Sequence, residues 1–222
     1  MKYVILIPIY NDRESLKILV ENINSEIKDL DHEISIVVIN DASSQQIIDT
    51  YTNTESISSF EIISMKENRG HARCIASGLK YIFEKKEFDF VIPMDGDGED
   101  RPEEIKNFIK LSEQSGEKSI VGERIKRSEG LFFQLCYHFH KFLTLAFTGK
   151  SIKFGNFSCL SKSTVKKLLN EKATWNSFSG SLKKIENELI SIPSIRGKRY
   201  FGPSQMSFFN LLKHSLSIIS VF

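Results

Sequence analysis

The 222-residue sequence has few cysteines, and their scarcity argues against two kinds of stabilising site. The three cysteines, Cys74, Cys136 and Cys159, are odd in number and lie far apart. They form no Cys-x-x-Cys pair, and no nearby histidine stands at the spacing of a zinc site. The sequence therefore predicts neither a disulfide framework nor a zinc site, and it favours a reducing compartment.

The sequence also lacks an excess of charge of either sign. Its 30 lysines and arginines stand against 28 acidic residues, so the net charge is only +2. A dedicated nucleic-acid-binding protein would carry a larger basic excess. Nucleic acid is therefore not an expected partner.

No hydrophobic run is long enough to predict a signal sequence or a spanning helix. Residues Met1–Ile9 are largely apolar, but Pro8 and the polar residues 11–14 end the run early. Leu131–Phe147 and Met206–Phe222 are rich in Phe and Leu, yet polar side chains interrupt both. We interpret the first run as a strand and the other two as amphipathic segments that suit a membrane surface, with a buried helix as the alternative for Leu131–Phe147.

Residues 1–128 alternate between short apolar runs and segments with apolar residues at helical spacing. Hydrophobic residues make up 41% of the chain, which is enough for one substantial core. Asp12 is expected to cap the first helix, and Pro102 to begin the helix after the fourth strand. This alternation predicts an α/β fold with a doubly wound, mostly parallel sheet and helices on both faces. The expected strands are Tyr3–Ile9, Glu33–Ile39, Phe60–Met65, Phe88–Met94 and Ser119–Gly122.

The pattern changes after Ser128. Gly155–Leu160 is typical of a turn and a short strand, and Ser163 is expected to cap a helix that runs through Leu169. Ile190–Phe201 predicts a strand or a hairpin.

The fourth apolar run leads directly into a cluster of acidic residues. In an open α/β sheet the ligand lies beyond the carboxyl ends of the strands, so Asp95 and Asp97 are expected beside a bound molecule. Two carboxylates separated by one residue can share one hard cation, and Gly96 and Gly98 let the backbone approach a ligand closely. Asp41 follows another strand in the same way. These residues predict a cation site at the carboxyl edge of the sheet.

Three other interpretations of the acidic cluster compete with a cation site. A solvated acidic loop is the simplest of them. An EF-hand is excluded, because Asp100 stands at the sixth position where that loop needs glycine. A dinucleotide-binding turn is excluded as well, because Arg101 replaces its third glycine.

Six short motifs, taken together, resemble the family-2 glycosyltransferases of GT-A fold, and within them the branch of dolichyl- and polyprenyl-phosphate sugar synthases. Each motif is weak by itself, but their order and spacing are specific, and they cover nearly the whole chain. The motifs are Ile7–Asp12, Val38–Ser43, Asn68–Gly70, Met94–Glu103, Gly155–Phe157 and Arg199–Met206.

The resemblance implies a role for each matching position. Pro8, Tyr10, Asp12 and Asp41 would line the pocket for the base and ribose of a nucleoside-diphosphate sugar. Asp95 and Asp97 would hold Mg²⁺ or Mn²⁺ against the diphosphate, where the cation neutralises charge on the leaving group. Arg199 would contact a donor or acceptor phosphate through its planar fork, and Arg69 is a further candidate for phosphate. Asp97 and Arg199 are thus the expected catalytic residues.

The sequence departs from the family pattern at two positions. Asn156, a candidate substrate-binding residue, stands where many relatives have Asp, and an amide cannot act as a base. Gln205 replaces the usual Lys. A sugar hydroxyl acceptor would need a base, for which Asp97, Glu99 and Asp100 are candidates, whereas an ionised phosphate acceptor would not.

The sequence therefore predicts an inverting, metal-dependent glycosyltransferase that acts on a polyprenyl-phosphate or saccharide acceptor. We expect a nucleotide-sugar-binding half at 1–128, an acceptor-side half at 129–204 and a C-terminal amphipathic helix at 205–222, located peripherally at the cytoplasmic face of the membrane. The alternatives are a catalytically silent nucleotide- or membrane-binding module and a sugar-1-phosphate nucleotidyltransferase, although Pro8–Glu14 lacks the glycine-rich basic loop of the latter. The sequence does not indicate an oligomeric state.

Overall fold

The computed structural model describes residues 1–45, 55–126, 152–202, 216–217 and 220–222. Within these residues, seven strands form one sheet in the order β3-β2-β1-β4-β6-β5-β7. The strands are β1 Lys2–Ile9, β2 Glu33–Asn40, β3 Ser59–Ser64, β4 Phe90–Pro93, β5 Ile120–Lys126, β6 Phe154–Ser161 and β7 Ile190–Ile195. The helices are α1 Arg13–Ile27, α2 His71–Lys85, α3 Ile105–Ser115, α5 Lys162–Asn170 and α6 Phe178–Ile185, with short 3-10 turns η1 at Pro102–Glu104 and η2 at Lys172–Trp175.

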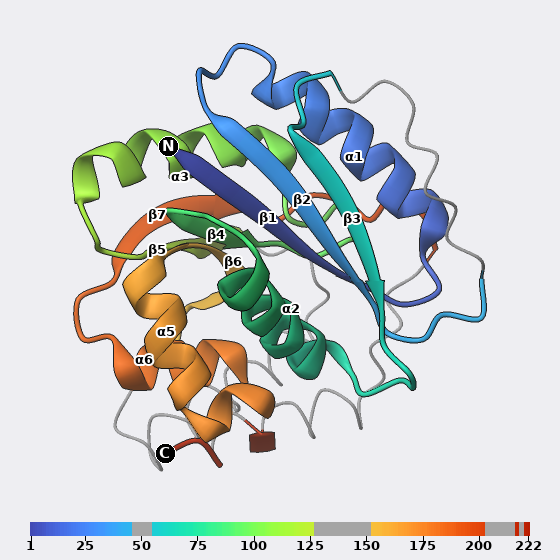
Figure 1. Cartoon of the computed structure of the whole chain (residues 1–222). Coiled ribbons are helices and arrows are strands. Elements are labelled where there is room, and N and C mark those ends of the chain that lie inside the picture. Colours follow the sequence, from blue (N-terminus) through green and yellow to red (C-terminus); the bar gives the residue numbers. More distant parts are fainter. Residues whose placement is uncertain (46–54, 127–151, 203–215, 218–219) are drawn as a thin grey trace.

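Helices cover both faces of the sheet (Figure 1). The side chains of its central strands are therefore buried on both sides. Alternate residues of β1 point to opposite faces. Ile5 and Ile7 belong to the core formed with α1 and α3, whereas Val4 and Leu6 belong to the core formed with α2, α5 and α6. This arrangement confirms the predicted α/β fold with helices on both faces.

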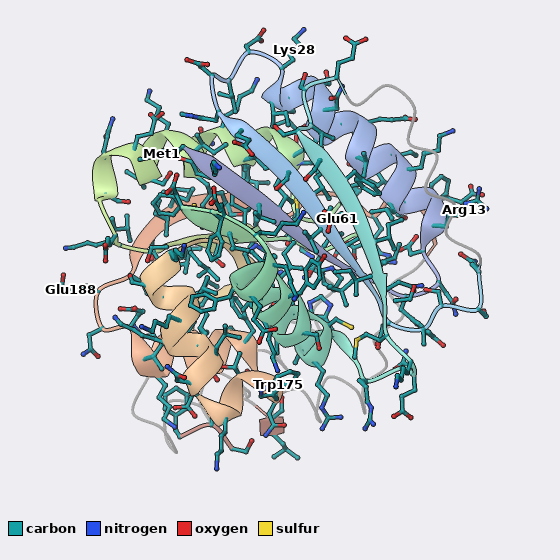
Figure 2. The ribbon with its side chains drawn as sticks, in the orientation of Figure 1. Met1, Arg13, Lys28, Glu61, Trp175 and Glu188 are labelled. Carbon is teal, nitrogen blue, oxygen red and sulfur yellow. The ribbon has the colours of Figure 1, made fainter. Side chains whose placement is uncertain are left out.

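The strand directions bring the carboxyl ends of β1, β2 and β4 to one edge of the sheet. β1 is parallel to both β2 and β4, and the loop after β1 leads directly into α1. Arg13, which begins α1, therefore lies at this edge, while Met1 and Lys28 mark the opposite end of β1 and of α1 (Figure 2). β6 breaks the parallel pattern because it runs antiparallel to both β4 and β5.

Several predicted details are corrected by the structure. The helix α5 is capped by Ser161, whose hydroxyl accepts a hydrogen bond from Thr164, and not by Ser163. Asp12 stands at the N-cap of α1 but makes no capping hydrogen bond, because its carboxylate faces an arginine instead. The predicted strand or hairpin Ile190–Phe201 is a strand only as far as Ile195.

The two predicted amphipathic segments are not tested. Leu131–Phe147 and most of Met206–Phe222 lie outside the described residues. In the part of the chain that the structure describes, no helix combines the length and the apolar character needed to cross a membrane.

Gly78 provides a test of how closely α2 packs on β1. A Cβ at this position would lie 2.3 Å from Leu6 Cδ1 and 3.0 Å from Ile39 Cγ1, and Leu6 is fully buried. We expect Gly78→Ala to lower the free energy of unfolding by about 1–3 kcal/mol through overpacking, despite the better helix propensity of alanine. Urea denaturation measures this loss.

Two further variants make that result specific. Lys80→Ala changes an exposed residue of the same helix and should leave the urea midpoint unchanged. The double variant Gly78→Ala/Leu6→Ala should lose less stability than the sum of the two single losses, since Leu6→Ala makes room for the new methyl group. Strict additivity would contradict the proposed clash.

Candidate active site

The acidic loop between β4 and η1 folds back on itself. The backbone N–H of Asp95 donates to the carboxylate of Asp100 at 2.8 Å, and that of Glu99 donates to Asp97 Oδ1 at 2.9 Å. Gly98 has a φ of +88°, in the region that favours glycine. The loop therefore gathers its carboxylates in one place instead of extending them into solvent.

A segment that follows β7 lies across this acidic loop. We call residues Arg196–Tyr200 the covering segment. The backbone N–H of Gly197 donates to the carbonyl oxygen of Glu99 at 2.8 Å, and that of Tyr200 donates to the carbonyl oxygen of Asp97 at 3.0 Å. Two main-chain hydrogen bonds thus join segments that are about 100 residues apart in the sequence.

Side chains hold both ends of the covering segment. The ring of Tyr200 lies against Gly98, where a Cβ would come within 2.6 Å of ring carbon Cε2. The hydroxyl of Tyr200 accepts a hydrogen bond from Asn22 of α1 at 2.9 Å. Just before the segment, the backbone N–H of Ile195 donates to the buried carboxylate of Glu104 at 2.8 Å. The segment is therefore fixed to α1 and to the start of the helix after the acidic loop.

Two arginines of the covering segment pair with acids of the site. Arg199 Nη1 lies 2.5 Å from Asp97 Oδ2, and its Nη2 lies 3.1 Å from Asp12 Oδ2. The Arg199 side chain is only 18% exposed. Arg196 forms an ion pair with Glu99. Arg199 thus links the acidic loop to the loop after β1.

Asp95 is held from its other side by a histidine and an amide. His71, the first residue of α2, places Nε2 at 3.2 Å from Asp95 Oδ1. Asn156 of β6 donates from Nδ2 to the same oxygen at 3.2 Å, and this Nδ2 lies 2.8 Å from His71 Nε2. The antiparallel register that pairs Val91 with Leu160 places Asn156 opposite Asp95 when it is continued beyond β4.

The pKa of Asp95 is shifted in the opposite direction from the pKa values of Asp97 and Asp100. Desolvation opposes the charged form of Asp95, but the nearby His71, then Arg124 and the hydrogen bond from Asn156, bring the pKa of its carboxyl well below the usual range. The pKa of His71 is raised, since the pull of Asp95 outweighs desolvation. Asp95 therefore carries a firm negative charge at neutral pH.

The other two carboxyl groups of the loop respond in the opposite direction. Burial and the charge of Asp95 raise the pKa of Asp97 to about 6, even though Arg199 favours its ionised form. Burial and Asp95 likewise raise the pKa of Asp100 to about 8. At neutral pH Asp97 is therefore ionised and Asp100 is largely protonated, and a bound cation would favour the charged form of both groups.

The loops after β1 and β2 are fastened to each other beside this site. The backbone N–H of Asn11 donates to Ser43 Oγ at 2.8 Å, and that of Ser44 donates to Asn11 Oδ1 at 2.9 Å. Asn11 has a φ of 50°, which is rare outside glycine and marks a constrained position. Pro8 is buried, whereas Tyr10 is 45% exposed and accessible to a ligand.

Asp41 holds the turn that precedes α2. Its two carboxylate oxygens accept hydrogen bonds from the backbone N–H groups of Arg69 and Gly70, at 2.7 and 2.8 Å. Asp41 is only 3% exposed. Its clearest role in the structure is therefore to position the start of α2, and a nucleoside contact would use its remaining lone pairs.

The structure brings five of the nine predicted site residues together around the acidic loop, namely Asp12, Asp95, Asp97, Asn156 and Arg199. Arg69 does not join them through its side chain, which is 52% exposed and pairs with Glu67.

Sequence reasoning missed the contacts of His71, Arg124, Arg196 and Tyr200. Arg124 approaches Asp100 at 4.0 Å from β5. Two of them carried a local signal, because His71 follows directly on the Asn68–Gly70 motif and Tyr200 lies within the Arg199–Met206 motif.

The acidic loop fits a divalent cation that shares its coordination with a ligand. No group of three or more His, Cys, Asp or Glu side chains among the described residues is arranged to hold a metal ion by itself. Mg²⁺ usually takes only one or two carboxylates and completes its shell with water and substrate phosphates. Asp95 and Asp97, whose carboxylates the acidic loop brings together, provide such a partial site.

Curated relatives of this chain are bacterial sugar transferases. An undecaprenyl-phosphate 4-deoxy-4-formamido-L-arabinose transferase from Photorhabdus laumondii is 26% identical over 216 residues, which cover 95% of this chain and 65% of the relative. The protein of the same name from Serratia proteamaculans is 26% identical over 231 residues, covering 99% of this chain and 67% of the relative. The chain thus spans about two thirds of the length of these relatives.

Solved structures show the same fold. A glucosyl-3-phosphoglycerate synthase from Mycobacterium tuberculosis, in complex with Mn²⁺, UDP-glucose and phosphoglyceric acid, has a TM-score of 0.67 at 13% identity and covers 99% of this chain and 78% of that one. A mannosyltransferase from Pyrobaculum calidifontis, in complex with GDP-Man and Mn²⁺, has a TM-score of 0.60 at 14% identity. The match covers 87% of this chain and 56% of the mannosyltransferase. The predicted GT-A fold is therefore confirmed.

The family model named Glycosyl transferase family 2 matches residues 4–173. The match includes β1 to β6 and the whole acidic loop, which is well over half of the chain. Together with the fold and the arrangement of the site, it shows that this chain belongs to glycosyl transferase family 2.

Proposed function

We propose that this protein transfers a sugar from a nucleoside-diphosphate sugar to a polyprenyl-phosphate acceptor, with inversion at the anomeric carbon and with Mg²⁺ or Mn²⁺. The observation that carries this proposal is the meeting of Asp95 and Asp97 with Arg199 at the carboxyl edge of the sheet. Such a site combines carboxylates for a cation with a guanidinium fork for phosphate. The names of the relatives support the lipid-phosphate acceptor.

Each part of the donor has suitable residues in this arrangement. The fastened loops that carry Tyr10 and Asp41 suit the nucleoside, and Asp95 and Asp97 would hold the cation. When bound, the cation would supply positive charge that offsets the charge growing on the leaving diphosphate. Arg199, which lies beside the acids with 18% of its side chain exposed, would contact the diphosphate. Solved neighbours of the same fold with Mn²⁺ and nucleotide sugars support this assignment.

The carboxylates around the acidic loop support an acceptor that needs no base. Glu99 is paired with Arg196, Asp97 with Arg199, and Asp100 is only 4% exposed. Asn156 cannot accept a proton from a hydroxyl group. An ionised phosphate, in contrast, attacks without losing a proton. A lipid phosphate therefore suits this site better than a sugar hydroxyl.

The proposed function is tested in two steps. A thermal-shift screen of nucleoside diphosphates and their sugars, with and without Mn²⁺, identifies the donor, since a ligand of the folded state raises the melting temperature. Transfer of the labelled sugar is then followed with undecaprenyl phosphate in anionic liposomes and with soluble saccharides. Transfer only to saccharides would refute the lipid acceptor, and no transfer or donor hydrolysis would favour a silent binding module.

Replacement of Asp97 tests the cation. Asp97→Asn keeps an oxygen for the N–H of Glu99, so the melting temperature should change little. Loss of the charge should weaken Mn²⁺ binding and lower turnover by at least about 100-fold, the scale seen when one charge-stabilising group is removed. Turnover is measured over a Mn²⁺ titration. Rates near those of the parent protein at all concentrations would show that Asp97 does not bind the cation.

Replacement of Arg199 should have opposite effects on cation and donor. Arg199 and a cation would both neutralise Asp97, so Arg199→Gln should tighten binding of Mn²⁺ alone while it weakens binding of the nucleotide sugar. Arg199→Lys keeps the charge but lacks the fork, and it should weaken donor binding with less effect on Mn²⁺. Calorimetry measures both constants. Weaker binding of Mn²⁺ alone to Arg199→Gln would contradict the competition.

Replacement of Asp41 should reduce both stability and donor affinity. Asp41→Ala leaves two backbone N–H groups without their acceptor, which should cost about 1–3 kcal/mol of unfolding free energy. Donor affinity should fall more than the turnover of bound donor, because a nucleoside contact stabilises ground and transition states alike. Asp41→Asn, which keeps one acceptor, is the milder control. Unchanged calorimetric affinity would refute the nucleoside contact.

A further inference from the structure

His71 contacts the acidic loop without belonging to it. It begins α2, and its imidazole Nε2 lies 3.2 Å from Asp95 Oδ1. Its side chain is 46% exposed, so burial of an apolar ring does not explain its position. The turn before it is fixed by Asp41 through the N–H groups of Arg69 and Gly70. The backbone thus presents His71 to the site in a defined way.

His71 and Asn156 act on the same atom. Both lie 3.2 Å from Asp95 Oδ1, and they contact each other at 2.8 Å. The three side chains come from α2, β6 and the acidic loop, so they form a triangle across three elements. Because both nitrogens act as donors toward Oδ1, the 2.8 Å between them is a close approach and not a hydrogen bond. Both contacts fall on Oδ1, so Asp95 Oδ2 lies outside the triangle.

We propose that His71 is a positioning residue that, together with Asn156, holds the Asp95 carboxylate in the orientation in which its second oxygen receives the cation. This inference rests on the proposed function. Partners that bond to a metal-binding side chain fix its orientation, and their loss commonly lowers metal affinity by about 10–100-fold. His71 would thus act on the cation through Asp95 without contacting the cation itself.

The same arrangement explains why an amide stands at position 156. A carboxylate there would lie about as close to Asp95 Oδ1 as the amide does now, and two like charges at that distance repel. Asn156 Nδ2 instead donates a hydrogen bond. The amide cannot act as a base, but it helps to position Asp95. Asn156→Asp should therefore weaken cation binding and should not provide a catalytic base.

The test measures Mn²⁺ binding directly, from the electron paramagnetic resonance signal of free Mn²⁺. The purified chain is titrated in the presence of the nucleoside diphosphate that gives the largest thermal shift. His71→Phe keeps a ring but removes both nitrogens, and it should weaken Mn²⁺ binding by about 10–100-fold. His71→Gln keeps a side-chain N–H donor and should recover most of the affinity. Lys80→Ala, on the exposed surface of the same helix, is the matched control and should bind Mn²⁺ as the parent does.

A double variant separates positioning from other roles. Because His71 and Asn156 act on one oxygen, His71→Phe/Asn156→Ala should lose little more affinity than the worse single variant. Losses that multiply would overturn the proposal, as would parental Mn²⁺ affinity in His71→Phe with a raised KM for the donor, which would indicate a direct donor contact.

Failure of the underlying function has a different signature. If the parent chain binds no Mn²⁺ with any nucleoside diphosphate, the proposed cation-dependent function is wrong, and the positioning role falls with it. If the parent binds Mn²⁺ and all His71 variants bind it equally well, only the positioning role is wrong.

Discussion

The burial of the acidic loop, together with the repulsion among its carboxylates, determines what surrounds them. Each charge removed from water is costly unless an opposite charge or a hydrogen-bond donor lies close by. The chain supplies these partners from three separate elements: His71 from α2, Arg124 from β5 and Arg199 from the covering segment. Even so, the pKa values of Asp97 and Asp100 stay raised, because burial and the charge of Asp95 outweigh these partners. A site in this condition favours the arrival of further positive charge.

The ion pair between Arg199 and Asp97 affects how a cation would bind. Its guanidinium lies against Asp97 at 2.5 Å, where a cation would also bind. A cation that arrives with a diphosphate brings both the replacement charge for Asp97 and a new anionic partner for Arg199. The exchange would therefore cost little electrostatic energy, whereas a cation without the diphosphate would leave Arg199 with Asp12 as its remaining acidic partner. Under the proposed function, the site therefore favours joint binding of cation and donor.

The sequence predicted the elements of the sheet better than the contacts across the site. β1 and β2 are apolar on both faces, and such runs identify buried parallel strands to within a residue or so. The acidic loop was evident because Asp95 and Asp97 directly follow a buried strand. The pairing of Arg199 with Asp97 joins residues 102 positions apart, and no local pattern encodes it. Ser161 and Ser163 are two candidate caps within one turn, and only the backbone conformation distinguishes them.

Because β6 runs antiparallel to β4, the second half of the chain contributes a side chain to the site. In a wholly parallel sheet the start of β6 would lie at the amino edge, on the side opposite the acidic loop. Because β6 is antiparallel to β4, its first residues lie beside the last residues of β4, and the continued register sets Asn156 opposite Asp95. The acidic loop of the first half thus receives a hydrogen-bond donor from the second half at Asp95. Since the partner is an amide, it holds Asp95 without adding charge, and under the proposed function the cation and the acceptor phosphate would complete the site.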